Sequence, residues 1–258
     1  MTILESELAR LEQQVDDAQK SAKALAAALA KLKTAVQTGA IAELERGLVG
    51  IGQRGQEAAE AAATLPSAWT FDARAYLEDG FAQELREVAS ANGLDIIDRD
   101  GRLSLFPTLI KIEPKDLGVR IGKRIERRIR PSALTKLLAS IQRKPQRFRE
   151  QAFLDLLYRT YQHLCGKKWV ANENRGPLKP LADLHAVLTL LPDSDYSLQE
   201  FGRDLLLLDR RPELRTRDGA RLQFEGSAIA RERVPQINVY DEHGRRHVYI
   251  ALRFAKGE

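Results

Sequence analysis

LESELARLEQQVDDAQKSAKALAAALAKLKTAV, residues 4–36, is followed after a short break by IAELERGLVGIGQRGQEAAEAAATL, residues 41–65. In both stretches apolar residues recur at alternating steps of four and three, which places them on one stripe of a helix. The first stripe consists of Leu4, Leu8, Leu11, Val15, Ala18, Ala22, Leu25, Leu29, Leu32 and Val36. The second consists of Ile41, Leu44, Leu48, Ile51, Gly55, Ala58, Ala62 and Leu65.

The two stripes match each other if the chain folds back at Gly39. Residues whose numbers add to 76 or 77 then face each other, so that large side chains meet large ones and small meet small. The predicted pairs are Val36 with Ile41, Leu29 with Leu48, Leu25 with Ile51, Ala22 with Gly55, and Ala18 with Ala58. We therefore predict an antiparallel coiled-coil helical hairpin over residues 1–66, with Leu4 and Leu8 overhanging. Such a hairpin is an interaction element, and Leu4, Leu8 and Leu11 are its expected sites for a protein partner or for self-association.

The composition is that of a globular protein. Of 258 residues, 43% are hydrophobic and 30% are charged, and no apolar run approaches the ~18 residues of a membrane span. The acidic first turn does not resemble a secretory signal. One cysteine, Cys165, excludes an internal disulfide and agrees with a reducing, cytoplasmic location. With only four histidines beside it, a structural zinc site is not expected.

The charge is distributed unevenly along the chain. The net charge is +5, but residues 119–258 alone carry 28 basic and 17 acidic side chains. Within that part, residues 119–179 carry 16 basic and 4 acidic side chains. Such a local excess attracts polyanions, nucleic acid first among them. An acidic protein partner, or a merely solvated basic face, would also agree with it.

Residues 67–130 are predicted to form a helix followed by a small antiparallel sheet. Leu77, Phe81, Leu85 and Val88 indicate one helix over about 71–92. The predicted strands are 94–98 and 102–106 around the tight turn Asp100–Gly101, then 109–113 and 119–129 joined through Pro114 to Gly118.

Residues 131–258 are predicted to form a basic helical region and a C-terminal helix–hairpin unit. Helices are expected after Pro131, with Ser132 as N-cap, over about 146–165, and over 181–191. Ser197 and Glu200 form a capping-box pattern before another helix. Strand-like runs follow at 221–224, 237–240 and 247–254. Helix, turn, helix and hairpin is the order of a winged helix, although many α+β domains share that order.

The segment Val119–Arg130 is the sharpest candidate for binding. As a strand or as a helix it would place isoleucines on one face and arginines on the other. Arginine forks suit phosphate oxygens, whose contacts supply affinity without reading sequence. An arginine-rich sheet edge that discourages strand pairing is the alternative.

A second candidate is the loop 166–180, where basic side chains, Asn172 and Asn174 surround Trp169 and could grip a nucleic-acid strand. The same tryptophan could instead anchor the loop to its own domain. Together the two candidates give the expected nucleic-acid-binding residues: Arg120, Lys123, Arg124, Arg127, Arg128, Arg130, Lys136, Arg143, Lys144, Arg147, Arg149, Lys167, Lys168 and Arg175.

Catalytic patterns are weak. Glu113-Pro114-Lys115 has the E-x-K form of a metal-dependent nuclease strand, with Asp98 or Asp100 upstream. However, the proline disrupts the strand that should present both side chains. We expect no catalytic residue, no metal and no cofactor.

These patterns predict a mainly helical α+β protein with segments 1–66, 67–130 and 131–258. Its expected role is a non-catalytic, nucleic-acid-binding accessory subunit of a larger assembly, which the hairpin joins. The alternative is a protein–protein adaptor whose basic surface docks an acidic partner without nucleic acid, and the third possibility is a metal-dependent nuclease.

Overall fold

The computed structural model describes residues 3–99, 102–144, 148–166, 175–190, 196–225 and 235–255. The chain divides into two compact units. The N-terminal unit comprises Met1–Gly93, Ile112–Arg120 and Arg124–Leu137, and the C-terminal unit comprises Leu94–Lys111, Ile121–Lys123 and Leu138–Glu258. The predicted mainly helical α+β class, with an N-terminal helical hairpin and small antiparallel sheets, is confirmed. The finer division into three segments stays a prediction.

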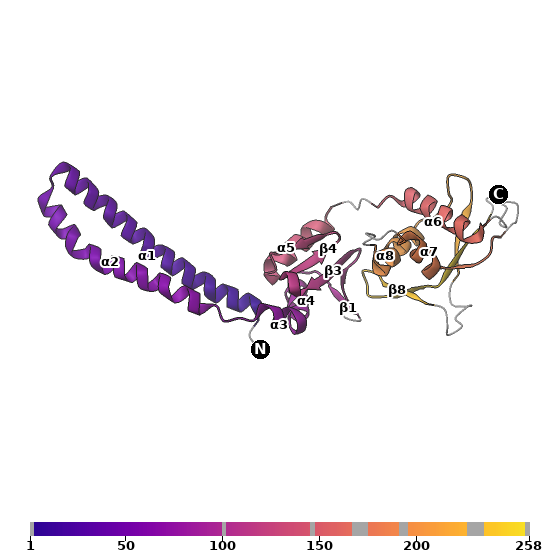
Figure 1. Cartoon of the computed structure of the whole chain (residues 1–258), viewed down its shortest axis with the longest axis horizontal. Helices are drawn as coiled ribbons and strands as arrows, with labels where there is room; N and C mark the ends of the chain where they lie inside the picture. The colour runs from indigo at the N-terminus through magenta and orange to yellow at the C-terminus, as the bar shows by residue number, and fades with distance from the viewer. Residues whose placement is uncertain are drawn as a thin grey trace. The chain divides into compact units, whose positions relative to one another are not determined.

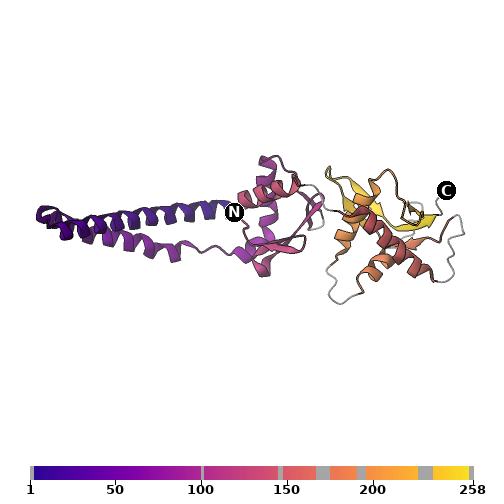
Figure 2. The same ribbon diagram turned by 90° about the horizontal axis from the view of Figure 1, so that it is seen from above.

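Two long antiparallel helices begin the N-terminal unit. Helix α1 spans Leu4–Thr38 and α2 spans Ile41–Ala68, and both views in Figures 1 and 2 show them side by side. Gly39 ends α1 with a φ of 71°, a left-handed conformation that glycine adopts without steric cost, so it lets the chain reverse. Pro66 lies inside the last turn of α2, near the predicted end of that helix.

The register of the hairpin differs from the prediction. A Cβ atom added to Gly47 would lie 2.9 Å from Leu32 Cδ1, so residues whose numbers add to 79, rather than 76 or 77, come together. Leu29 and Leu48 are 48% and 53% exposed and therefore flank the seam instead of filling it. The seam between the helices contains Ala18 and Ala35, which are buried.

Short elements complete the sheet region. The single helix predicted over 71–92 is in fact two, α3 (Ala73–Asp79) and α4 (Phe81–Ala91), because the chain bends at Gly80. Strands β1 (Ile97–Arg99), β2 (Arg102–Leu105), β3 (Thr108–Glu113), β4 (Gly118–Ile121) and β5 (Arg124–Glu126) form one sheet in chain order. A short 3₁₀ helix, η1 (Pro114–Asp116), connects β3 to β4.

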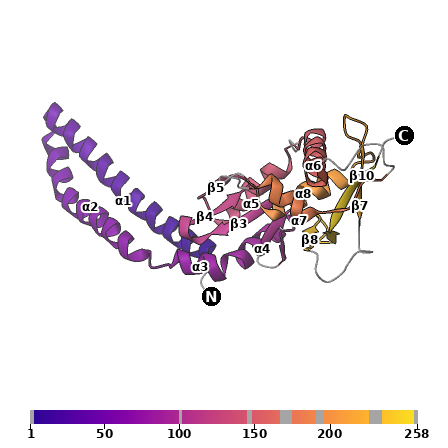
Figure 3. The same cartoon turned by 45° about the vertical axis from the view of Figure 1, so that its right-hand side comes forward.

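The C-terminal unit packs helices against two small sheets. Its helices, seen together in Figure 3, are α6 (Glu150–Cys165), α7 (Leu181–Leu188) and α8 (Leu198–Asp209). Strands β6 (Lys179–Pro180), β10 (Ala251–Ala255) and β7 (Arg221–Glu225) form a sheet in that order, and β8 (Ile237–Tyr240) pairs with β9 (Arg246–Tyr249). The run 247–254, predicted as one strand, is divided at Ile250 between the two sheets.

The C-terminal unit has a densely packed hydrophobic core of its own. Tyr161, Phe201 and Phe254 are fully buried, and Tyr158 and Tyr161 pack their rings 4.9 and 5.1 Å from that of Phe254. Helix α5 (Pro131–Gln142) precedes α6 in the chain, and its residues fall in both units. None of the described helices has an apolar stretch long enough to cross a lipid bilayer.

Candidate nucleic-acid interface

The predicted basic segment does not form one continuous strand or helix. Gly122 and Lys123 make a turn between β4 and β5, and the residues from Arg127 to Arg130 are outside both strands. Gly122 has a φ of 59°, which accommodates the reversal. The interpretation with all isoleucines on one face and all arginines on the other is therefore wrong beyond Ile121.

Three arginines of this segment, Arg120, Arg128 and Arg130, form hydrogen bonds with carboxylates of the N-terminal unit. Arg120 donates to Glu113 over 3.0 Å, and Arg128 donates to both oxygens of Glu126 over 2.9 and 2.7 Å. The hydrogen bonds from the Arg128 side chain and amide lower the pKa of Glu126 to about 2, against a small opposing effect of burial. These arginines stabilise their own surroundings and are the weaker candidates for phosphate contacts.

Arg130 belongs to a contact at the base of the hairpin. Its Nε donates to Glu5 over 2.7 Å and its Nη1 to Glu12 over 2.6 Å. Glu5 also accepts from the amide and the hydroxyl of Ser132, both over 2.9 Å, so it caps the first turn of α5 from outside. Ser132 thus does not act as the predicted N-cap, because α5 begins at Pro131.

The other basic residues of the predicted site are exposed wherever the structure describes them. They are Lys123, Arg124, Arg127, Lys136, Arg143, Lys144, Arg149 and Arg175. Arg147, Lys167 and Lys168 lie outside the described residues, as does most of the candidate loop with Trp169. The structure thus leaves a dispersed set of exposed cations on residues 123–149.

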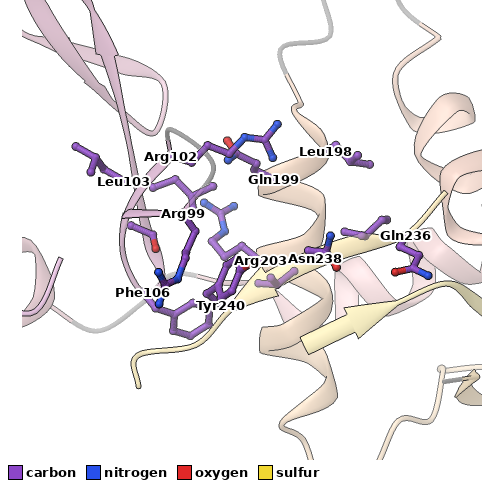
Figure 4. A pocket seen from close by; sticks show the side chains of 14 residues that line it. Arg99, Arg102, Leu103, Phe106, Leu198, Gln199, Arg203, Gln236, Asn238 and Tyr240 are labelled. Atoms are coloured by element: carbon purple, nitrogen blue, oxygen red, sulfur yellow. The ribbon is translucent and has the colours of Figure 1, made fainter. Parts of the chain in front are cut away.

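A more compact cationic site lies in the C-terminal unit and was not predicted from the sequence. Arg99 and Arg102 come from β1 and β2, and the two residues pair across the hairpin. Gln199 and Arg203 come from α8, and Asn238 comes from β8 (Figure 4). Together with apolar side chains these residues line one pocket, whose 14 described lining residues include none that is acidic.

Local structure fixes the α8 side of this pocket. The Ser197 hydroxyl accepts from the Glu200 amide, and the Glu200 carboxylate accepts from the Ser197 amide, so the predicted capping box is confirmed. One turn later, a Cβ atom on Gly202 would lie 2.6 Å from Val239 and 2.9 Å from Ile237. Only glycine allows α8 to approach β8 this closely.

Arg203 is held in place by a buried acid. Its Nε and Nη2 lie 2.8 and 2.7 Å from Asp204 Oδ1, and the Tyr196 hydroxyl donates to Asp204 Oδ2 over 2.8 Å. Burial raises the pKa of Asp204, although Arg203 and Tyr196 oppose that effect. The carboxylate orients the guanidinium and also offsets part of its charge, so Arg99 and Arg102 carry most of the positive charge of the pocket.

The described lining of the arginine pocket is suited to an anion. Three guanidinium groups with the side-chain amides of Gln199, Gln236 and Asn238 provide donors suited to phosphate oxygens. Asn238 Oδ1 already accepts from Arg246 over 3.0 and 2.9 Å, which fixes that amide. In the described part of the chain, no group of three His, Cys, Asp or Glu side chains could hold a metal ion.

The residues of the nuclease hypothesis are used structurally. Strand β3 ends at Glu113, Pro114 begins η1, and Lys115 lies in that 3₁₀ turn. The cation beside the Glu113 carboxylate is Arg120. Asp100 lies outside the described residues.

The expected partner residues at the overhang are only partly accessible. Leu4 is 3% exposed, while Leu8 and Leu11 are half-buried. Glu84 of α4 accepts from the amides of Leu4 and Glu5 over 3.0 and 2.9 Å, and Tyr76 donates its hydroxyl to the same carboxylate. The overhang therefore anchors the hairpin within its own unit.

One signal in the sequence could have indicated the arginine pocket. A two-residue Asp-Gly turn places the residues on either side of it opposite each other, here Arg99 and Arg102. The contribution of α8 could not be predicted in this way, because only the tertiary fold brings Arg203 close to the β1–β2 hairpin. No protein-family model, curated protein or solved structure matches this chain.

Proposed function

We propose that this protein is a non-catalytic accessory subunit that binds nucleic acid through phosphate contacts and joins a larger assembly through its helical hairpin. The observation that carries the proposal is the arginine pocket between β1–β2, α8 and β8, whose described lining residues include no acid. Its guanidinium groups supply paired donors of the geometry that phosphate oxygens accept.

The exposed cations of residues 123–149 are further positive charges available to a polyanion. They would add electrostatic affinity that depends on salt but not on sequence, because such contacts release counterions and read no base edge. We place the protein in the cytoplasm, in line with its single cysteine.

In the C-terminal unit, α6, β6, α7, α8, β7 and β10 follow the order of a winged helix with β8 and β9 inserted before β10, but α8 is unlike a free recognition helix. Strand β8 covers it at Gly202, and among its residues Phe201, Leu205 and Leu208 are buried. Insertion of this helix into a major groove would require β8 to move away. Backbone contacts at the rim of α8, through Gln199 and Arg203, agree better with this packing.

The experiment is a fluorescence-anisotropy titration of short duplex DNA, single-stranded DNA and RNA at several salt concentrations. The test variant is Arg99→Gln/Arg102→Gln, and the control is Arg46→Gln/Arg54→Gln, which removes the same charge from the hairpin. We expect the test variant to bind about tenfold more weakly and the slope of log K against log salt to fall by about two, while the control stays close to wild type. Equal behaviour of the two variants would reject the pocket as the binding site.

In the protein-adaptor alternative, the same basic surface docks an acidic partner protein and no nucleic acid is bound. This alternative predicts no salt-dependent binding of any of the three nucleic acids by the wild-type chain. Cleavage of a labelled strand on addition of Mg²⁺, abolished by Glu113→Gln, would instead favour the nuclease.

A further inference from the structure

The hairpin leaves a broad apolar face exposed. In a heptad that begins with Leu4 in α1 and Leu44 in α2 at position a, the buried residues and most of the half-buried ones occupy positions a and d, while Leu8 and Gly55 at position e are also half-buried. The large apolar residues of the sequence pattern occupy a and e instead, because their steps alternate between four and three. The e face consists of Leu8, Val15, Ala22, Leu29 and Val36 of α1 and of Ile41, Leu48, Gly55 and Ala62 of α2.

Both halves of the e face lie on the same side of the hairpin. Two antiparallel helices that share an a/d seam bring their e positions to one side and their g positions to the other. The g side carries charged residues, among them Lys31 and Glu43 beside one surface hollow. On the e side, Val36 and Ile41 are 61% and 60% exposed, beside the half-exposed Leu29 and Leu48.

We infer that a second copy of this chain covers the e face. The two hairpins, aligned tip to tip, then form a four-helix bundle. This inference rests on the assembly part of the proposed function and names its partner. The apolar stripe of each helix covers positions a and e, so the seam between α1 and α2 buries only part of it, and a third and fourth helix bury the remainder.

The layers of the e face match a second copy. If a twofold axis runs along the hairpin, each level meets the same level of the partner, with α1 opposite α2 of the other copy. Leu29 and Leu48 then meet the same two leucines, and the small residues Ala22 and Gly55 meet each other and allow close approach. A tip-to-base arrangement would instead place Leu48 and Ile41 of α2 against the small residues Gly55 and Ala62, although α1 would still pair large residues with large ones.

The charges beside the e face also match a second copy in this orientation. The flanking b positions are uncharged at Gln19, Ala26, Gly52 and Ala59, which widens the apolar surface. The two charged ones near the tip are Lys33 of α1 and Glu45 of α2, both exposed and at nearly the same level. The twofold axis brings Lys33 of each copy to Glu45 of the other, so opposite charges meet twice.

Sedimentation equilibrium of the full chain tests the inference. We expect a monomer–dimer equilibrium, and Leu29→Asp should raise the dimer dissociation constant at least about 100-fold, because it places two buried charges in one layer. Ala30→Asp, one residue further on the exposed outer face, is the matched control and should change it little. Circular dichroism at 222 nm should show that both variants keep their helices, since Leu29 is half exposed in the monomer.

A charge exchange tests the orientation. Lys33→Glu and Glu45→Lys should each weaken the dimer about tenfold, and the double variant should restore it. In a Cys165→Ser background, a short bis-maleimide should link Lys33→Cys chains to Glu45→Cys chains when the two are mixed, and much less when either is alone.

A chain that stays monomeric at all concentrations, or a double variant that is no better than either single one, would overturn the inference. Nucleic-acid binding with the predicted salt slope would still stand in that case. Loss of salt-dependent binding with an intact dimer would reject the proposed function and keep the dimer.

Discussion

The hairpin and the C-terminal unit deal with their apolar surface in opposite ways. No described residue of α2 is buried, and Val36, Ile41, Leu48 and Val49 of the hairpin are more exposed than covered. In the C-terminal unit, Phe201, Leu205, Leu252 and Phe254 have no exposed surface. The hairpin therefore leaves apolar surface exposed, whereas the C-terminal unit buries its own core and presents arginines.

Glu84 joins the hairpin to the rest of its unit at one point. Its carboxylate satisfies two amides at the start of α1 that a helix leaves without partners, and it also binds Tyr76. Burial and the adjacent Glu84 carboxylate raise the pKa of the Tyr76 hydroxyl. The tertiary cap stands in for a local one, since Ile3 provides no side-chain cap.

Truncation of a leucine should give the largest difference between the two regions. Leu205→Ala should destabilise the C-terminal unit by about 3 kcal/mol, because the side chain is fully buried and a cavity remains. Leu48→Ala should destabilise the hairpin of the monomeric full chain by less than about 1 kcal/mol. Hydrogen exchange followed by mass spectrometry, read over α8 and over α2, measures each effect locally, and equal losses would contradict the comparison.

Removal of the charge at Glu84 should come next. Glu84→Gln keeps the shape but loses charge-assisted hydrogen bonds to three donors, which should cost about 2 kcal/mol. Exchange protection should fall first in the initial turns of α1. Glu87→Gln, an exposed change on the same helix, should be silent within about 0.5 kcal/mol.

Replacement of glycine by alanine should change the stability of the two regions in opposite directions. Gly202→Ala should destabilise the C-terminal unit by about 1–2 kcal/mol, because the new methyl group would overlap Val239 and Ile237. Gly52→Ala meets no atom within 4 Å and should stabilise α2 by roughly 0.5–1 kcal/mol through helix propensity. Thermal melting of each variant, followed by circular dichroism, should show the two opposite shifts.

The smallest effect concerns acid stability. Burial would raise the pKa of Asp241, but hydrogen bonds from His247 and from the amides of Arg245 and His243 outweigh it and lower the pKa to about 2. Because this pKa lies below the ordinary value of about 3.9, the contribution of Asp241 to stability is complete above pH 4 and is lost as the pH falls toward 2. Asp241→Asn should therefore flatten the decline of stability between pH 4 and 2 in urea titrations, and an unchanged slope there would contradict this assignment.

Local patterns predicted much of the fold. The heptad spacing with Gly39 gave the hairpin, the Ser197–Glu200 pattern gave the start of α8, and the turn residues gave most strands of the small sheet. The breaks at Gly80, Gly122 and Ile250 were not predicted, because periodicity continues through a bend that only tertiary packing imposes. Glu84 and the arginine pocket were missed for the same reason: their partners lie far away in the sequence, as Leu4 lies 80 residues from Glu84.

If the hairpin carries assembly and the C-terminal unit carries nucleic-acid binding, a variant of one region should affect only one of the two properties. Sedimentation velocity with a fluorescent duplex long enough for one chain measures both. Leu29→Asp should sediment as a monomer and still bind the duplex with the wild-type salt dependence. Arg99→Gln/Arg102→Gln should sediment as a dimer and bind more weakly, with a lower salt dependence. If either variant lost both properties while remaining folded, the division of roles between the two regions would be wrong.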